Sequence, residues 1–328
     1  METVSPDLKS TRSSIAQCIH AMLQYTVRKD LSLIDVMGLT SHAFRIRVDD
    51  KAGLYGPTSH VWGSFYRRAV ENLGFEAVCF DPIIDPIPPE HVEIALGHIH
   101  RTLDRDVPAV VWDLFGGDFA VVYGYDDERQ LFHAKDREHE GTVPYEKLSR
   151  GHIMTLTIVK EKEFDYVDSL SRALAMALTH GRYPEDGITE FRPGLAAYDA
   201  WIRAFETRSA DPLGNSYNAL YVYDARRFAV QFLNEVRDRF RNGVLAEPKR
   251  HGGYGFDSGY MAASAEEAAR HYAEVASALG ELHERFPFPH GGDPSESGVA
   301  ETAVRLLQRA KASEEQGLRY LARMYYDL

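Results

Sequence analysis

Hydrophobic and polar positions change their spacing along the chain, and this change predicts two halves of different structure. In the first half, short apolar runs and alternating positions are interrupted by helical stretches, as in a mixed fold. Beyond the charge run Lys160–Glu163, apolar residues recur at helical spacing almost to the end. We therefore expect an α+β domain over residues 1–160, with helices on an antiparallel sheet, and an all-α helical bundle over residues 161–328.

Short β-rich segments predict the central strands of the first half. Three strands are expected around a hairpin, at Val110–Trp112, Phe119–Tyr123 and Gln130–Ala134. If the turn lies between Asp127 and Glu128, the register places Asp118 roughly opposite Asp136. Two carboxylates are therefore expected at one end of this hairpin.

The remaining elements follow from helical spacing and from short β-branched runs. In the first half we expect a helix from about Ser14, helices at Thr58–Leu73 and Glu90–Leu103, and strands at Phe75–Phe80 and Ile153–Val159. In the second half we expect helices at Tyr166–Thr179, Gly194–Thr207, Tyr217–Arg241, Ala265–Arg285 and Gly298–Met324.

Composition narrows the classes of function. The chain has 328 residues, room for about two domains, and its two cysteines cannot form a disulfide framework, so we expect a reducing, cytoplasmic location. No apolar run approaches the roughly 18 residues of a membrane span, and the N-terminus lacks the apolar core of a signal peptide. The net charge of −12 opposes nucleic acid or an anionic membrane as the main partner.

Cys18 is the first residue of chemical interest. It lies on the apolar stripe of the first helix, where Ser13 or Ser14 provides a cap. From composition alone, a free cysteine in this position is a small buried core residue.

The sequence around Cys18 nevertheless resembles a known fold. The segment QCIHAMLQYTVRKDLSLIDVMGLTSHAFRI, with matches at Gly38, Leu39, Ala43, Phe44 and Arg45, is similar to the opening of papain-like domains of the peptidase C39 and butirosin-biosynthesis-H types. Further along, Gly124-Tyr125-Asp126 resembles the strand that follows the catalytic histidine in these families. The similarity covers about residues 8 to 160. It implies a papain-like cysteine-peptidase fold with Cys18 at the nucleophile position and Asp136 at the position of the orienting carboxylate.

The chain departs from the family pattern at two positions. Asp118 stands where the catalytic histidine is expected, and a carboxylate there disfavours the thiolate instead of stabilising it. Arg12 and Ser13 occupy the region of the oxyanion-stabilising glutamine, whereas Gln17, next to the cysteine, has the wrong spacing for that role.

The candidate substrate-binding residues extend beyond these neighbours. The full set comprises Arg12, Ser13, Gln17, Trp62 and Arg226. Trp62 has the helical spacing of a core residue, which is the alternative to a ligand platform. Arg226, near the start of a long helix, suits a carboxylate or a phosphate, the alternative being a salt-bridged face. No histidine or cysteine spacing indicates a metal site.

Three hypotheses of function follow. The first is a cysteine-dependent acyltransferase or amide hydrolase of a secondary-metabolite or peptide-processing type, without a cofactor, acting on a small molecule, a peptide or a carrier-protein thioester. The alternative is a catalytically inactive papain-like fold that binds a small molecule or peptide. A third is general acid and base chemistry by the two aspartates without the thiol. The sequence leaves open whether the protein forms a homo-oligomer.

Overall fold

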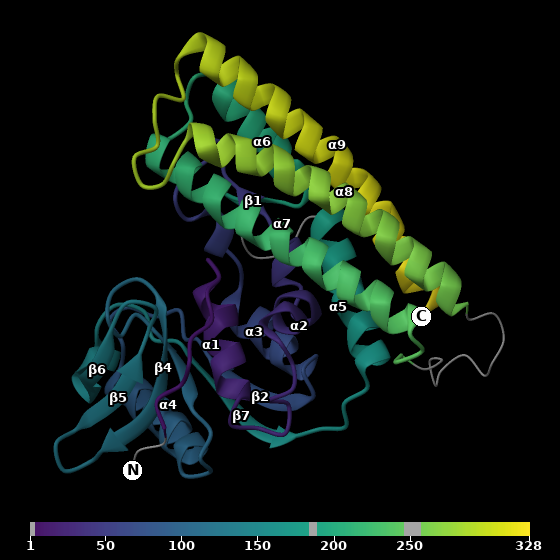
Figure 1. Ribbon diagram of the computed structural model, residues 1–328. Coiled ribbons are helices and arrows are strands. Elements are labelled where there is room, and N and C mark those ends of the chain that lie inside the picture. The colour runs from purple at the N-terminus through teal and green to yellow at the C-terminus, as the bar shows by residue number, and fades with distance from the viewer. Residues whose placement is uncertain (1–3, 184–188, 246–256) are drawn as a thin grey trace. The chain divides into compact units, whose positions relative to one another are not determined.

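The computed structural model describes residues 4–183, 189–245 and 257–328, and its fold is α+β, as expected. The chain divides into two compact units (Figure 1). Unit 1 comprises Met1–Val36 and Val61–Phe164, and unit 2 comprises Met37–His60 and Asp165–Leu328. The sequence divides the chain once, near residue 160, whereas the contacts also assign residues 37–60 to the helical unit. Helix α2 (Leu33–Leu39) spans the first division.

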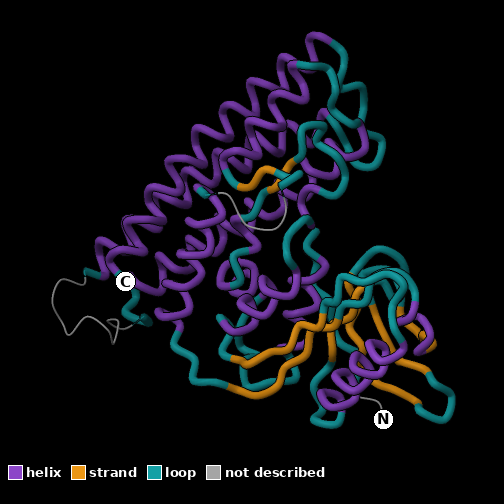
Figure 2. Tube along the Cα trace, turned by 180° about the vertical axis from the view of Figure 1, so that it is seen from behind, coloured by secondary structure: helices purple, strands orange, loops and turns teal. Residues whose placement is uncertain are grey.

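Unit 1 is built on a six-stranded antiparallel sheet with the order β2-β7-β3-β4-β5-β6. Strands are drawn in orange in Figure 2. The strands are β2 (Phe75–Phe80), β3 (Ala109–Trp112), β4 (Phe119–Asp126), β5 (Leu131–Lys135), β6 (Glu140–Pro144) and β7 (Thr155–Glu161). The helices are α1 (Ser14–Leu23), α3 (Trp62–Glu71) and α4 (Pro89–Leu103), and the 3-10 turn η3 is Tyr145–Ser149.

Opposite faces of this sheet carry different helices. Val111 and Ala120, which are partners across β3 and β4, pack into one core with Ile99 of α4. Because side chains alternate along a strand, the neighbouring partners Trp112 and Phe119 point to the other face. There both rings contact Trp62 of α3, with centroids 4.9 and 5.2 Å apart, and α1 packs against β3 and β4.

The register of the β4–β5 hairpin differs from the expected one. Asp126 pairs with Leu131 and Val121 pairs with Lys135, with an irregularity between Val122 and Gly124. Continued by one position, this register places Asp136 opposite Ala120 rather than opposite Asp118. The turn is centred between Glu128 and Arg129, one residue later than expected, and the irregularity then shifts the pairing partly back. The apolar pattern reveals neither, because neither changes the order of apolar and polar residues along the chain.

Unit 2 contains the five helices that the second half predicts. They are α5 (Tyr166–Arg182), α6 (Leu195–Glu206), α7 (Pro212–Arg241), α8 (Ser258–Arg285) and α9 (Ser297–Asp327). The segment 37–60 adds the turns η1 (His42–Phe44) and η2 (Gly56–Thr58), and it adds strand β1 (Arg47–Val48), which pairs with β8 (Arg192–Pro193). Helix α7 begins earlier than expected, because the Asp211 carboxylate accepts a hydrogen bond from the Gly214 backbone and caps it.

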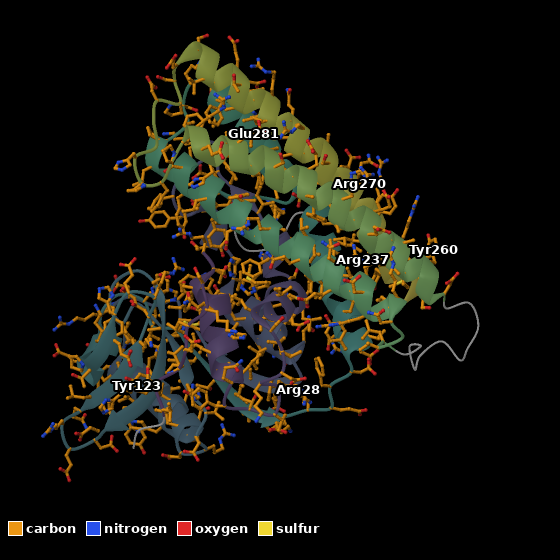
Figure 3. All side chains as sticks on the ribbon, in the orientation of Figure 1. Arg28, Tyr123, Arg237, Tyr260, Arg270 and Glu281 are labelled. Atoms are coloured by element: carbon orange, nitrogen blue, oxygen red, sulfur yellow. The ribbon has the colours of Figure 1, made fainter. Side chains whose placement is uncertain are left out.

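The long helices α7, α8 and α9 lie side by side, as both ribbon and tube views show (Figures 1 and 2). Their outer faces carry exposed charges, among them Arg270 and Glu281 of α8 (Figure 3). Exposed ion pairs contribute at most about 1 kcal/mol each, so the stability of the bundle rests on its buried faces. Those faces meet at small residues such as Gly317 of α9, which lies against the Tyr272 ring of α8.

Substitutions at two glycines of α9 test how closely these helices pack. A Cβ atom at Gly317 would lie 2.8 Å from the Tyr272 ring, whereas a Cβ atom at Gly298 would meet open space. We expect Gly317→Ala to lower the free energy of unfolding by about 1 to 3 kcal/mol through overpacking. Gly298→Ala should be neutral or stabilising by up to about 1 kcal/mol, because alanine favours the helix. Urea unfolding followed by circular dichroism measures both, and equal effects would contradict the close packing.

Candidate functional site around Cys18

Helix α1 holds Cys18 on its buried side. Ser13 has the extended backbone of an N-cap, and Ile15, Ile19 and Met22 fix the inward stripe of the helix. Cys18 is the fifth residue of the helix, and only 1% of its surface is exposed. Its Sγ donates a hydrogen bond to the backbone oxygen of Phe119 at 3.4 Å. The thiol therefore faces the start of β4, next to Asp118.

The residues that precede α1 make further contacts with the same region. Ser14 Oγ accepts a hydrogen bond from the Phe119 backbone nitrogen at 3.5 Å, and Arg137 donates to the Thr11 backbone oxygen at 2.8 Å. Ser13 donates its backbone N–H to Thr11 Oγ1 at 3.2 Å, while its own Oγ is buried without a hydrogen-bond partner. The start of α1 is thus attached to strand β4 and to the segment after β5.

The environment of Cys18 favours the neutral thiol. Burial raises the pKa of Cys18 well above its ordinary value, and the charges of Asp118 and Asp136 raise it further. Arg137 acts in the opposite direction but is the smallest of these influences. The three charged groups that act on the thiol include no imidazole, whereas a catalytic cysteine ordinarily has one beside it.

Asp136 is held by the turn between β5 and β6. It is 6% exposed, and its Oδ1 accepts hydrogen bonds from the backbone nitrogens of Glu138 and His139, at 2.8 and 2.6 Å. The His139 imidazole lies 3.1 Å from the same oxygen and stacks on the Phe115 ring, with centroids 5.5 Å apart. The carboxylate that the resemblance assigns to orienting a histidine therefore closes a local turn.

A histidine and aspartate pair lies beside the aromatic residues of the same sheet face. His152 Nε2 and Asp81 Oδ1 are 2.6 Å apart, and the second Asp81 oxygen accepts the Gly63 backbone N–H at 3.0 Å. The His152 ring stacks on Trp62, with centroids 5.1 Å apart. The Asp81 side chain is 8% exposed and that of His152 is 39% exposed, so the imidazole reaches solvent while its partner does not.

The sequence did not indicate this pair. Asp81 follows β2 and His152 precedes β7, and the two strands pair antiparallel with Phe80 opposite Thr155. This pairing brings the end of one strand beside the start of the other. Local patterns predicted both strands but not that they are neighbours. Without this pairing, nothing in the sequence placed the two side chains together.

The remaining predicted site residues lie in different environments. Arg12 is exposed just before α1, and Gln17 is buried beside Cys18 in α1. Trp62, at the start of α3, is half-buried among aromatic rings. Arg226 belongs to unit 2, whereas Cys18 belongs to unit 1.

Arg226 forms the centre of a buried polar group in unit 2. Its Nε and Nη2 donate to the two carboxylate oxygens of Glu314, at 2.9 and 2.6 Å, and Nη1 donates to the backbone oxygens of Ala43 and Arg45. Tyr198 donates its hydroxyl to the same carboxylate at 2.6 Å. Burial alone would lower the pKa of Arg226, but Glu314 offsets burial and the net pKa is raised. The guanidinium therefore stays charged and connects α6, α7 and α9 to the segment 37–60.

Among the residues that the structure describes, no group of three or more histidine, cysteine, aspartate or glutamate side chains is arranged to hold a metal ion. Within the same residues, no helix combines the length and the apolar character needed to cross a membrane. No protein-family model matches the chain, and no curated protein matches it significantly.

Substituting the buried arginine tests its structural role. Arg226→Met leaves the Glu314 charge buried and unpaired, so we expect a loss of about 3 to 5 kcal/mol in the free energy of unfolding. Arg237→Met, on the same helix, removes the ion pair with the exposed Asp238 and a hydrogen bond to Asn234, and should cost less than about 1 kcal/mol. Urea unfolding monitored by circular dichroism compares the two, and similar losses would contradict the assigned role of Arg226.

Proposed function

We propose that unit 1 is a papain-like domain that binds a small molecule or a peptide and does not use Cys18 as a nucleophile. The observation that carries this proposal is the state of the thiol. Cys18 is almost fully buried, and its S–H group is donated to the Phe119 carbonyl. Its pKa is raised by burial and then by two carboxylates.

A nucleophilic cysteine needs opposite conditions. The attacking species is the thiolate, and even an unperturbed thiol is only a few per cent thiolate at neutral pH. Here the thiolate would lose its bond to the Phe119 carbonyl and would face that oxygen and the charge of Asp118. Since each unit of pKa elevation removes a factor of ten in thiolate, little of the reactive form remains.

In this proposal the ligand contacts a group of rings on the face of the sheet that also carries Cys18. Trp62, Trp112 and His152 are only partly covered, and they lie together, with ring centroids about 5 Å from Trp62. Asp81 orients the imidazole, so the group offers flat apolar surface beside a fixed polar edge. Binding sites for small molecules and peptides commonly combine such features.

A second candidate is the cysteine-dependent acyltransferase or amide hydrolase. The specific observation that favours it is that the charges of Asp118 and Asp136 both act on the Cys18 thiol. The papain-like resemblance assigns these three residues to one site. In that reaction Asp118 would accept the thiol proton as the sulfur attacks an acyl carbonyl, and would return the proton to the departing thiol or amine. An acceptor amine or a water molecule would then take the acyl group from Cys18, which regains its proton. The substrate class would be a peptide, a small amide or a carrier-protein thioester.

The alkylation rate of Cys18 separates the two candidates. In a Cys79→Ser variant, iodoacetamide labelling from pH 6 to pH 10 is followed by intact-protein mass spectrometry, and the same protein in urea supplies the rate of the unperturbed thiol. We expect labelling at pH 7 to be at least about tenfold slower in the folded protein than in urea, because the raised pKa leaves less thiolate. The rate should increase steeply with pH.

Variants of two acidic residues show whether Asp118 acts on the sulfur. Asp118→Asn removes one of the charges that raise the pKa, so it should accelerate labelling at a given pH, although burial keeps the rate below that in urea. Glu128→Gln makes the same charge change in the exposed hairpin turn and should have no effect. Rapid labelling at pH 6, or an acyl adduct on Cys18 after exposure to an acetyl thioester, would refute the binding proposal and favour the enzyme.

A further inference from the structure

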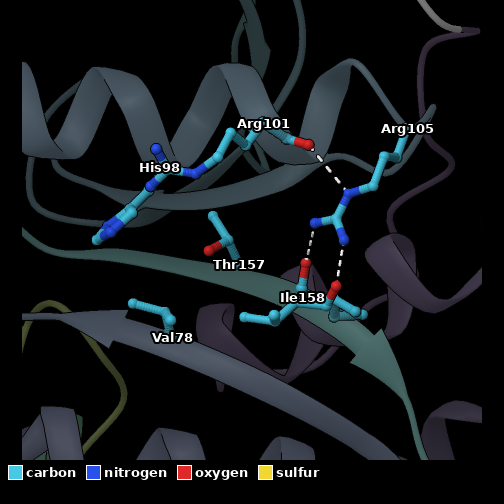
Figure 4. Close-up of a pocket in the computed structure, with 7 residues that line it drawn as sticks. Val78, His98, Arg101, Arg105, Thr157 and Ile158 are labelled. Atoms are coloured by element: carbon cyan, nitrogen blue, oxygen red, sulfur yellow. Dashed lines mark hydrogen bonds between the residues drawn. The ribbon is translucent and has the colours of Figure 1, made fainter.

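The structure assigns a second binding site to unit 1, for a small organic carboxylate with an apolar body, in a pocket beneath helix α4. The pocket has a volume of about 470 Å³, within the range of small-molecule sites (Figure 4). Its lining comes from α4 and the following turn, from β2 and from β7: His98, Arg101, Arg105, Val78, Thr157 and Val159, with Ile158 at the edge. This site is independent of the function proposed for the Cys18 face.

The pocket opens on the face of the sheet opposite to Cys18. Thr155 pairs with Val111, whose side chain points toward α4, and alternation carries Thr157 to the same face. Val78 pairs with Thr157 and shares that face. Ligands of the two faces would therefore not compete for the same surface.

The pairing of β7 with its two neighbouring strands, β3 and β2, is interrupted near Val159, and this interruption explains why the pocket exists. Strand β3 begins only at Ala109, after Pro108, which has no N–H to extend the ladder along β7. On the other side of β7, toward β2, Ala77 pairs with Ile158 but Glu76 pairs with Lys160, which leaves Val159 without a partner residue. The end of β7 therefore has carbonyl groups that neighbouring strands do not use.

Arg105 binds these carbonyl groups and forms one wall of the pocket. Its two terminal nitrogens donate to the backbone oxygens of Ile158 and Val159, and its Nε donates to the Arg101 backbone oxygen at 3.0 Å (Figure 4). These bonds attach the end of α4 to β7. They use three of the five guanidinium N–H groups, and among the residues that the structure describes no carboxylate pairs with Arg105, so its positive charge is not neutralised by an ion pair there.

The groups that remain available are those that recognise a carboxylate. Arg101 is exposed on α4 and makes no ion pair among the residues that the structure describes, so its side-chain donors are available. His98 lines the same pocket, but its Nδ1 atom is buried without a hydrogen-bond partner and does not itself face the ligand. Burial, followed by the charge of Arg101, lowers the pKa of His98, so the ring is neutral near pH 7 and can donate from one nitrogen.

Charge and shape together select the ligand class. The lining contains two arginines and no aspartate or glutamate, although the whole chain carries a net charge of −12. Arg105 already uses three of its N–H groups on backbone oxygens, so Arg101 is the guanidinium of this lining with all of its donors unused among the described residues. One such fork pairs with the two oxygens of a carboxylate, whereas a doubly charged phosphate has further oxygens that would need more donors than this lining supplies. Val78 and Val159 offer apolar contact for the body of the ligand.

The experiment uses three probes that share one apolar body: 3-phenylpropanoate, its neutral amide 3-phenylpropanamide, and 2-phenylethyl phosphate. Binding to the full chain is measured by NMR, with the His98 ring resonances as the local readout and the exposed His139 as the control. We expect the carboxylate to bind with a Kd on the order of 1 mM, as for other fragments of this size, and to shift His98 but not His139. The amide and the phosphate should each bind at least about tenfold more weakly.

Matched variants connect the binding to the pocket. Arg101→Gln should weaken binding of 3-phenylpropanoate at least about tenfold, because a charge-assisted pair is lost. Arg68→Gln makes the same change at an exposed position of α3 and should leave the Kd unchanged. Trp62→Ala should also leave it unchanged, which separates this site from the proposed function of the other face.

Several results would overturn the assignment. They are the absence of carboxylate binding up to about 20 mM, more than tenfold weaker than the expected Kd, equal binding of acid and amide, tighter binding of the phosphate, and unchanged affinity in Arg101→Gln. Loss of binding in Trp62→Ala would place the ligand on the Cys18 face instead and would also refute the pocket.

Discussion

Unit 1 depends on the backbone of Phe119, where strand β4 begins. Its carbonyl accepts the Cys18 thiol, its amide reaches Ser14, and its ring packs against Trp62 and Trp112. One residue thereby joins α1, α3 and β3 on a single face of the sheet. The sulfur is a donor in this arrangement, so deprotonation would weaken the contact that holds α1 in place. The chemistry of the thiol and the integrity of the fold therefore oppose each other.

The two faces of the sheet offer different surfaces for recognition. On the face of α1 and α3, aromatic rings lie beside a histidine whose orientation Asp81 maintains. On the face of α4, arginines from the helix end lie over a strand whose ladder is interrupted at Val159. The difference arises from the backbone: the β3–β4 ladder is regular and packs side chains tightly, whereas the bulge between β2 and β7 and the late start of β3 leave space beside the end of β7.

The sequence predicted the α+β class and the elements themselves better than their pairing. The helices of the second half and strands such as β2 follow from apolar periodicity, which reports the side of an element that is buried. Periodicity does not report which strands are neighbours, so Asp81 and His152 were not connected. Nor does it fix the centre of the β4–β5 turn, which lies one residue later than expected and moves Asp136 out of the expected alignment with Asp118. The resemblance to papain-like domains placed Cys18 near Asp118, but exposure depends on packing that no local pattern encodes.

The division of the chain has a consequence for biosynthesis. Arg226 bonds to the carbonyl of Arg45, 181 residues earlier, and the carboxylate of Glu314 completes the same network. A ribosome releases residues 37–60 long before it makes these partners, so the segment has to remain unsatisfied while unit 1 emerges around it. Unit 2 can mature only after translation is nearly finished. Separating the two halves of the chain after Phe164 would leave residues 37–60 without Arg226 and Glu314. The two halves therefore cannot be exchanged as independent domains.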